Sequence, residues 1–556
     1  MAVGRLPALL AALALSLAPL SCDQASDDDD ATGDDDSTAD DDDSSGDDDD
    51  SSGDDDSSGD DDTTADLLQI LSADPAVNAV DVPVDGALSV AFTADVDPDT
   101  LTPDSVLLST RQAGFLDVAL AYDEDSRTLT ITPGVNLRPG DRLRLTLTPA
   151  VRDVAGEGIV TQVDGDSLQV GTSLGYWAAA LADGAMLQPG PAWESVEADR
   201  TITARYGDVD NDGWLDVAVA SGEMEDEDPV RVYYNDHGAL GTEAGWSSGP
   251  AAIHFGVDLG DVDRDGWLDM ATGKRDGETE LYVNDGQGSF PPVPGWASTT
   301  RFITRSVAFG DVDNDGWLEL ATANTYADLE EEKHADGFNE VFGNDAGVLS
   351  DDPVWQTEDD RFSRMVIWAD INGDGLDDLC FANMWEGQSV YYNRGGSFPP
   401  TADWQSADED QTRYIAVHDF DRDGWLDLAA CNESGYACIY FNLGGELETV
   451  PSWESGQYRK AVSVAAGDLD GDGWPDLVFG HAWEHTEPFD GTLNTKTAYL
   501  NQGGTFGSEP DWTSANAGNS WGLALGDVDR DGDLDLFAAE RNDGDAGAPN
   551  TLYLSL

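Results

Sequence analysis

Basic residues are scarce in this sequence of 556 residues. Lysine and arginine together number 26 against 113 acidic residues, and the formal net charge is −87. Such a surface repels phosphate backbones and anionic membranes, which are poor partners unless a local basic patch exists. We therefore expect no nucleic acid as partner, and cations are favoured. The six histidines recur at no fixed place and form no recognisable nucleophile or zinc motif.

Long apolar runs are also missing, apart from one at the N-terminus. Residues 6–17 are apolar but too few to span a bilayer, and they precede "PLSC", which ends at Cys22. This start resembles a bacterial lipoprotein signal peptide. The resemblance implies a signal peptide at 1–21, cleaved before Cys22, and a lipid on Cys22 as the only link to a membrane. Ordinary secretory cleavage is the alternative. Either interpretation predicts export, to the cell surface or outer membrane in the first case and as a secreted protein in the second.

Residues 22–65 lack both large apolar side chains and positive charge. Between residues 23 and 62 the chain repeats units like "SSGDDDD", with 22 aspartates and no lysine or arginine. Self-repulsion and the absence of a possible core predict a disordered acidic tether. Loose, non-specific calcium sequestration by this tether is a weaker alternative.

A segment of alternating apolar and polar residues follows, at 66–172. "ALSVAFTADVD", "RTLTITP" and "DRLRLTLTPAV" are typical of strands, and "PVDG", "NLRPGD" and "VAGEG" are typical of turns. The pattern predicts a small β-sandwich. The segment resembles bacterial Ig-like domains of the SbsA type, which implies a spacer or adhesive module.

The rest of the chain, 183–556, is a repeat array. A nine-residue aspartate motif begins at seven positions, and a tryptophan precedes each motif by 15 positions (208 − 193 for the first). Each repeat contains the pattern of four short antiparallel strands, which predicts a seven-bladed β-propeller. The motifs begin at Asp208, Asp261, Asp311, Asp370, Asp419, Asp468 and Asp527.

The two ends of the array predict how the ring closes. The last repeat stops at "NTLYLSL" without its tryptophan segment, whereas an orphan segment at 183–193 precedes the first repeat. We expect the orphan segment to supply the outer strand of the last blade, which would remove two exposed strand edges.

The motif "DVDNDGWLD" concentrates carboxylates in a tight loop. Asp208, Asp210, Asp212 and Asp216 would repel one another strongly unless a cation lay among them, and calcium suits such a set of oxygens. An EF-hand loop is excluded because its position 12 must be acidic, whereas here that position carries Val219 or another residue of a strand pattern. Seven copies make an ordinary polar turn a poor alternative.

These loops resemble the calcium-binding hairpins of FG-GAP (VCBS-type) repeats, which are related to the propeller of integrin α subunits. The resemblance implies up to seven structural calcium ions, each held by side chains at positions 1, 3, 5 and 9, and we expect the position-7 carbonyl to contribute. Asn372 and Glu319 depart from the pattern, which predicts two weaker sites. The expected ligands are Asp208, Asp210, Asp212, Trp214 and Asp216; Asp261, Asp263, Asp265, Trp267 and Asp269; Asp311, Asp313, Asp315, Trp317 and Glu319; Asp370, Asn372, Asp374, Leu376 and Asp378; Asp419, Asp421, Asp423, Trp425 and Asp427; Asp468, Asp470, Asp472, Trp474 and Asp476; and Asp527, Asp529, Asp531, Asp533 and Asp535.

Three arginines occupy one repeat position. Arg305, Arg364 and Arg413 stand six residues before their motifs, and Trp521 has the same place in the last repeat. The first interpretation is that the arginines pair with carboxylates of neighbouring blades and hold the blades together. The alternative is an anion pocket for a uronate, a sulfate or a peptide carboxylate.

Two further cysteines, Cys431 and Cys438, end adjacent predicted strands. A disulfide between them and a pair of buried thiols are both compatible with the sequence.

The predicted function is binding or adhesion at the cell surface, with an extracellular protein or glycan as ligand. Seven equivalent carboxylate clusters argue against an enzyme, because an active site needs one asymmetric set of residues. An extracellular polysaccharide lyase or hydrolase on a calcium-stabilised propeller is the first alternative. A structural envelope protein without a discrete ligand is the second.

Overall fold

The computed structural model describes residues 67–556, except for 164–165, 181–185, 223–227, 250–251, 276, 326–336, 360, 483–493 and 542–546. The predicted signal peptide, Cys22 and the predicted tether lie outside the described residues. Within these residues all regular structure is β-strand apart from one 3-10 turn, η1 (Pro98–Thr100), so the all-β prediction is confirmed. None of them forms a helix with the length and hydrophobicity that a membrane crossing requires.

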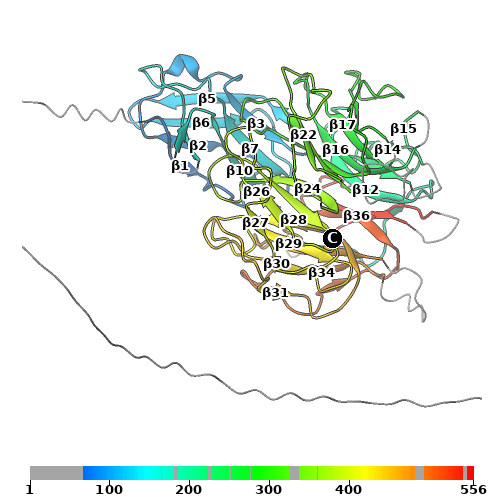
Figure 1. The fold of residues 1–556 in the computed structure, drawn as a ribbon. Helices are drawn as coiled ribbons and strands as arrows, with labels where there is room; N and C mark the ends of the chain where they lie inside the picture. The colour runs from blue at the N-terminus through cyan, green and yellow to red at the C-terminus, as the bar shows by residue number, and fades with distance from the viewer. Residues whose placement is uncertain are drawn as a thin grey trace, which may run out of the picture. The chain divides into compact units, whose positions relative to one another are not determined.

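The first domain is a β-sandwich of two four-stranded antiparallel sheets, ordered β1-β2-β6-β5 and β10-β7-β3-β4 (Figure 1). In β2 the alternation seen in the sequence places one side of the strand in the core: Leu88, Val90 and Phe92 are buried and the residues between them are half-buried. The strands are β1 (Ile70–Asp74), β2 (Leu88–Phe92), β3 (Val106–Thr110), β4 (Gly114–Leu116), β5 (Val118–Asp123), β6 (Thr128–Pro133), β7 (Arg142–Leu147), β8 (Thr161–Val163), β9 (Asp166–Leu168) and β10 (Thr172–Trp177).

The sandwich extends past the predicted boundary at 172. Strand β10 pairs along its whole length with β7, from Thr172 opposite Leu147 to Trp177 opposite Arg142. The sequence pattern missed this strand because its residues are buried on both sides.

Seven four-stranded sheets follow, and each has the strand content predicted for a propeller blade. The innermost strand of each blade has seven residues, and the predicted tryptophan begins each outermost strand. The first three blades are β12 (Thr201–Gly207), β13 (Asp216–Ser221), β14 (Arg231–Tyr233) and β15 (Trp246–Ser247); β16 (His254–Gly260), β17 (Asp269–Lys274), β18 (Glu280–Tyr282) and β19 (Trp296–Ala297); and β20 (Thr304–Gly310), β21 (Glu319–Asn324), β22 (Glu340–Phe342) and β23 (Trp355–Gln356).

The other four blades repeat this order. They are β24 (Ser363–Ala369), β25 (Asp378–Asn383), β26 (Ser389–Tyr391) and β27 (Trp404–Gln405); β28 (Thr412–His418), β29 (Asp427–Asn432), β30 (Cys438–Tyr440) and β31 (Trp453–Glu454); β32 (Ala461–Gly467), β33 (Asp476–His481), β34 (Thr497–Tyr499) and β35 (Trp512–Thr513); and β36 (Ser520–Gly526), β37 (Asp535–Glu540), β38 (Thr551–Tyr553) and β11 (Trp193–Glu194).

The last blade combines both ends of the array, as the orphan segment predicted. Strand β11 pairs with β38, with Trp193 opposite Leu552, and the indole Nε1 of Trp193 donates to the Leu240 carbonyl of the first blade (2.9 Å). The inner strand β12 of the first blade also contacts β36 of the last. The ring is therefore joined by backbone pairing and by side-chain packing.

Neighbouring blades pack through small residues and large aromatic rings. Gly310, at the end of β20, leaves the space that the Trp368 indole of the next blade occupies, since a Cβ atom on Gly310 would lie 2.5 Å from that ring. The indole Nε1 of Trp368 donates to the Ala308 carbonyl (3.0 Å). Such contacts hold the inner strands at a fixed spacing and so position the loops between them.

Candidate metal sites

The seven aspartate motifs form the hairpins between the first and second strands of the blades. We number these hairpins loops 1 to 7 in chain order, beginning with residues 208–216. In loop 1 the backbone N–H groups of Gly213 and Trp214 donate to the carboxylates of Asp208 (3.0 Å) and Asp212 (2.8 Å). The residue at position 4 of loop 1, Asn211, has a φ of 55°, and Gly213 has a φ of 93°. These turns fold the chain back on itself and bring alternate side chains to one side.

Several loops bring together three of the carboxylates that the sequence singled out. In several loops, three carboxylates can each place one oxygen within 4.8 Å of the others. The groups include Asp208, Asp210 and Asp216; Asp261, Asp263 and Asp265; Asp311, Asp313 and Asp315; Asp419, Asp421 and Asp427; and Asp468, Asp470 and Asp476. Oxygen atoms gathered in this way could hold a hard divalent cation. The role of the position-7 carbonyls stays a prediction.

Three of the position-1 aspartates carry a buried oxygen without a partner. Asp208, Asp311 and Asp527 are only 5%, 3% and 7% exposed, and the Oδ1 atom of each accepts no hydrogen bond from the described residues. A buried carboxylate oxygen left in this way is costly unless a cation binds it. The residues present therefore fit a calcium ion, by an observation independent of the motif.

Burial also opposes ionisation of the carboxyl at position 9. It raises the pKa to about 8 at Asp216, Asp269, Asp427, Asp476 and Asp535, and to about 9 at Glu319. Neighbouring loop carboxylates raise these pKa values further. A divalent cation among them would favour the ionised forms.

A recurrent asparagine escaped the sequence interpretation. In the first blade the Asn235 backbone N–H donates to Asp216 Oδ1 (2.8 Å), while its side chain donates to the carbonyls of Leu215 and Val528. The second carbonyl belongs to loop 7, so this side chain joins neighbouring hairpins. Equivalent bonds recur at Asn284, Asn344, Asn393, Asn442 and Asn501. The signal was present in the sequence, because each of these residues follows the third strand of its repeat.

Comparison with protein families identifies the repeated unit. A model described as FG-GAP-like repeat matches residues 208–272, 261–322, 370–430, 419–479 and 490–538, and a second model, FG-GAP repeat, matches 304–347. A bacterial Ig-like domain model matches 62–167. The chain is an FG-GAP repeat protein with a bacterial Ig-like domain. Both families indicate an extracellular or surface protein.

The search of curated proteins finds no match to this FG-GAP repeat protein. Among solved structures it is similar to two crystal structures of BBS1N in complex with ARL6DN, one soaked with mercury and one with lead. In each case the TM-score is 0.43 and the sequence identity is 12%, and the match covers 67% of this chain and 97% of the other.

At the opposite ends of the inner strands, the predicted arginine positions coincide with a recurrent β-bulge. The register between the first and second strands shifts once in every blade, at the residue six places before the loop. A bulge changes the direction of its side chain and ends regular pairing. The bulged residues are Ile202, Phe255, Arg305, Arg364, Arg413, Val462 and Trp521.

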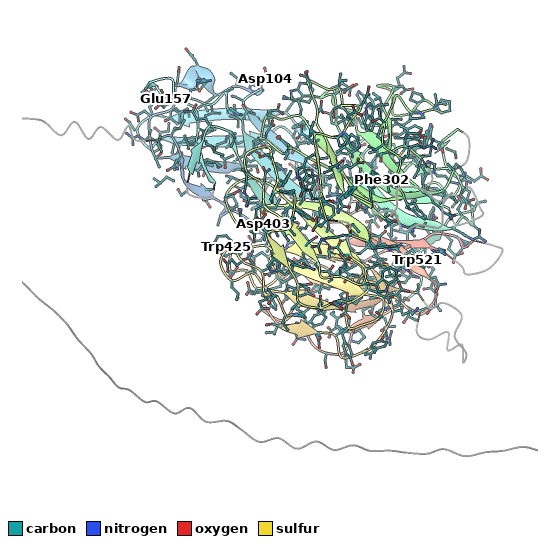
Figure 2. The ribbon with its side chains drawn as sticks, in the orientation of Figure 1. Asp104, Glu157, Phe302, Asp403, Trp425 and Trp521 are labelled. Carbon is teal, nitrogen blue, oxygen red and sulfur yellow. The ribbon has the colours of Figure 1, made fainter. Side chains whose placement is uncertain are left out.

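The three arginines of this set make cation–π contacts with aromatic rings. The Arg305 guanidinium lies 4.0 Å from the ring centroid of Phe255 in the preceding blade, and that of Arg413 lies 4.4 Å from Trp521 of the last blade (Figure 2 labels Trp521). Arg413 Nε also donates to Glu433 of its own blade (2.6 Å). Arg364 lies 4.7 Å from the Phe362 ring. Arg305 and Arg413 thus contact aromatic rings of other blades, as ties between blades would. Pairing of the three arginines with carboxylates of neighbouring blades stays a prediction.

The structure keeps Cys431 and Cys438 as buried free thiols. Cys438 pairs with Ala430 across the strands, so Cys431 is one residue out of register and faces the other side of the sheet. The two sulfurs therefore contribute to different core clusters, and the disulfide alternative does not hold in this fold.

Proposed function

We propose that this protein is an exported calcium-binding surface protein, attached by a lipid at Cys22, that binds a protein or glycan. Calcium is structural in this proposal. The residues at positions 1, 3, 5 and 9 of each loop would hold the ion, and the ion would neutralise carboxylates that the fold brings together. The unpartnered Oδ1 atoms of Asp208, Asp311 and Asp527 support this assignment.

One observation supports the assignment of ligand binding to one face of the propeller. The Ig-like domain lies against the carboxylate loops, for example through Arg138 bonded to Asp208. The connections between second and third strands lie at the other end of the blades, where their lengths differ from blade to blade. Variable loops on a rigid scaffold are the usual place for recognition. We therefore assign ligand binding to this second face, which we call the variable face.

Exposed aromatic side chains support this assignment. On the variable face, Trp385 is 52% exposed and Tyr436 is 40% exposed, and both lie in connections between second and third strands. Trp385 has a φ of 64°, an unfavourable conformation for a bulky residue, and its backbone N–H donates to the Asp410 carbonyl (3.0 Å). Large exposed aromatic residues are characteristic of protein interfaces.

The proposed role is non-catalytic. The carboxylates that could act as acids or bases recur in equivalent loops, whereas an active site needs one asymmetric set of residues. The ligand would be recognised by the propeller, with the Ig-like domain and the tether as spacers.

Arrays of glycans and extracellular proteins, probed with the full chain in calcium and in chelator, test this function. For any ligand found, Trp385→Ala with Tyr436→Ala should weaken binding roughly ten-fold or more. Leu443→Ala, at an exposed residue beside Asn442 and the carboxylate loops, should not.

Three outcomes would contradict parts of the proposal. Full binding by the double variant would remove these aromatic residues from the ligand site. An array without any retained ligand would favour the structural envelope protein. Cleavage of an arrayed polysaccharide would favour the enzyme.

A further inference from the structure

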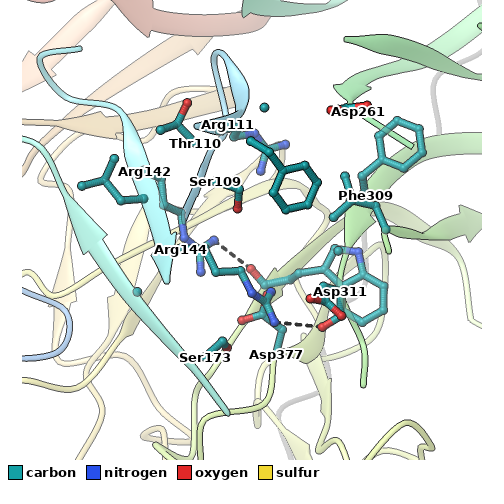
Figure 3. A pocket seen from close by; sticks show the side chains of 18 of the residues that line it. Ser109, Thr110, Arg111, Arg142, Arg144, Ser173, Asp261, Phe309, Asp311 and Asp377 are labelled. Atoms are coloured by element: carbon teal, nitrogen blue, oxygen red, sulfur yellow. Dashed lines mark hydrogen bonds and ion pairs between the residues drawn. The ribbon is translucent and has the colours of Figure 1, made fainter. Parts of the chain in front are cut away.

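The Ig-like domain is bonded directly to the carboxylate loops. Figure 3 shows Arg111, Arg142 and Arg144 of this domain beside Asp311 and Asp377 of the propeller, around a cavity of about 120 Å³. Arg111 is paired with Asp258 (2.9 Å), on an inner strand of the propeller. Arg144 is paired with Asp377 of loop 4. The basic residues of one domain therefore face the acidic loops of the other.

Asp208 in loop 1 is shared between the Ig-like domain and the candidate metal site. Its backbone N–H donates to the Gln112 carbonyl (2.9 Å), and its Oδ2 accepts from Arg138 (2.6 Å). Arg138 also donates to the same Gln112 carbonyl (3.0 Å). The remaining oxygen, Oδ1, is the buried atom without a partner. One side of this residue thus holds the Ig-like domain, and the other side is left for a cation.

Loops 3 and 4 are held in a similar way. Arg144 donates to the Asp311 carbonyl (2.8 Å) and to the Asn314 side chain (2.9 Å) in loop 3. In loop 4, the Gly375 carbonyl accepts from the Ser173 N–H (2.9 Å), and the Asp374 carbonyl accepts from Thr161 (2.9 Å). Most of these contacts use backbone atoms of the loops, so they require the loops to keep this conformation.

We propose that calcium binding in loops 1, 3 and 4 and docking of the Ig-like domain stabilise each other, with Asp208 as the residue common to both. The proposal rests on the calcium sites of the proposed function. A cation on Asp208 Oδ1 would fix the loop in the geometry that presents Oδ2 and the N–H to Arg138 and Gln112. Docking of the Ig-like domain would in turn hold the Asp208 carboxylate in the orientation that leaves Oδ1 available to the cation.

Charge repulsion between Arg138 and the cation does not reverse this coupling. Loop 1 has four carboxylates, at Asp208, Asp210, Asp212 and Asp216, whereas the guanidinium and a divalent ion together carry three positive charges. Both cations therefore stay in an attractive field. Thermodynamic linkage then requires that loss of either partner weakens the other by the same factor.

Loop 6 provides an internal control. Among the described residues, no hydrogen bond or ion pair joins residues 468–476 directly to the Ig-like domain, although the loop has the same motif. Its one connection is indirect, because the Gly473 carbonyl accepts from Arg422 (3.0 Å), which pairs with Asp81 of the Ig-like domain. Its calcium affinity should depend on docking less than the affinities of loops 1, 3 and 4 do. The coupling thus predicts that the seven sites respond unequally to a change in the Ig-like domain.

The first experiment is a calorimetric calcium titration of the full chain carrying Arg138→Gln and Arg144→Gln. We expect a subset of the ions to bind roughly five-fold more weakly or worse, while the remainder bind as in the wild type. Arg127→Gln is the matched control, because Arg127 pairs with Asp95 within the Ig-like domain. That variant should titrate like the wild type.

The second experiment needs no variant. Hydrogen exchange of the Ser173 and Asp208 amides, which donate across the interface, is measured on the wild-type chain in calcium and in chelator. We expect chelation to accelerate exchange at both amides more than at β2 in the core of the Ig-like domain. Calcium affinity that is unchanged or increased in the double variant, or equal exchange at the two amides with and without calcium, would overturn the coupling. A wild-type chain that binds no calcium would refute the calcium sites themselves.

Discussion

The two faces of the propeller differ in how strictly the blades repeat. On the face with the carboxylate loops, six blades close the hairpin with the same asparagine bonds, and every loop keeps its spacing. On the variable face, the connection after β29 spans residues 433–437, whereas that after β33 spans 482–496. The asparagine and loop residues that recur in the blades are those that a blade needs for its own stability. The connections that differ in length on the variable face are not needed for that stability and can therefore serve ligand recognition.

The largest expected effect comes from breaking the ring that supports both faces. Deletion of residues 183–193 removes Trp193 and its pairing with Leu552, and exposes the edge of β38. An exposed edge recruits other strands, so we expect aggregation or a large loss of stability. Size-exclusion chromatography and thermal melting measure both. A monomeric deletion variant that melts like the wild type would refute closure by β11.

Removal of calcium should act on the repetitive face. Calcium held as proposed would bind the folded loops better than the unfolded chain, so at a hundred-fold excess over Kd each site would add about 2.7 kcal/mol to the free energy of unfolding. Calorimetry should count up to seven ions, and the loops with Asn372 and Glu319 should lose theirs first. A melting temperature that chelator leaves unchanged, in protein shown to be metal-free, would end the structural-calcium interpretation.

The pH dependence of stability should change sign with calcium. Without calcium, the folded-state pKa of Asp216 is raised to about 8 by burial, and Asp269 and Asp427 behave alike. Between about pH 4 and pH 8 the folded chain then binds more protons than the unfolded chain, so stability falls as pH rises. Saturating calcium should abolish or reverse this fall, because the ions stabilise the ionised carboxylates. Denaturant unfolding at several pH values, with calcium and with chelator, tests this prediction.

A smaller effect is expected from a single asparagine. Asn284→Ala removes side-chain bonds to the carbonyls of Val209 and Leu268 and should cost about 1–3 kcal/mol of unfolding free energy. Asn136→Ala, at an exposed residue of the Ig-like domain, is the control. Equal stability of the two variants would show that the repeated asparagines do not hold neighbouring blades together.

The smallest effect concerns the arginines of the variable face. Replacing Arg305, Arg364 and Arg413 by Gln should cost about 0.5–2 kcal/mol for each lost cation–π contact and leave calcium affinity unchanged. If they form an anion pocket, the triple variant should lose a carboxylate or acidic glycan ligand without loss of stability. Melting and binding measurements on the same variant separate the two interpretations.

The sequence by itself determined the repeated part of this protein. A fixed spacing of tryptophan, aspartate and alternating apolar residues is a local property of each repeat. It therefore predicted the strands, the seven blades and the loops. It also predicted that the segment with Trp193 completes the last blade. It would also have revealed Asn235 and its equivalents, since their position recurs as regularly as that of the aspartates. The strands of the Ig-like domain before β10 were also predictable, because their alternating apolar and polar residues are a local pattern. Strand β10 was not, because its residues are buried on both sides and show no alternation.

Only the tertiary structure decided which residues of other blades and of the Ig-like domain contact these repeats. The bonds of Arg138 to Asp208 and of Arg144 to loops 3 and 4 join residues far apart in the chain, and no periodicity encodes them. The same holds for Arg413 against Trp521, and for the register that separates Cys431 from Cys438. Local patterns fix how each blade folds because they depend on neighbouring residues. Contacts between domains and between blades depend on how whole surfaces meet, which is decided by packing and charge in three dimensions.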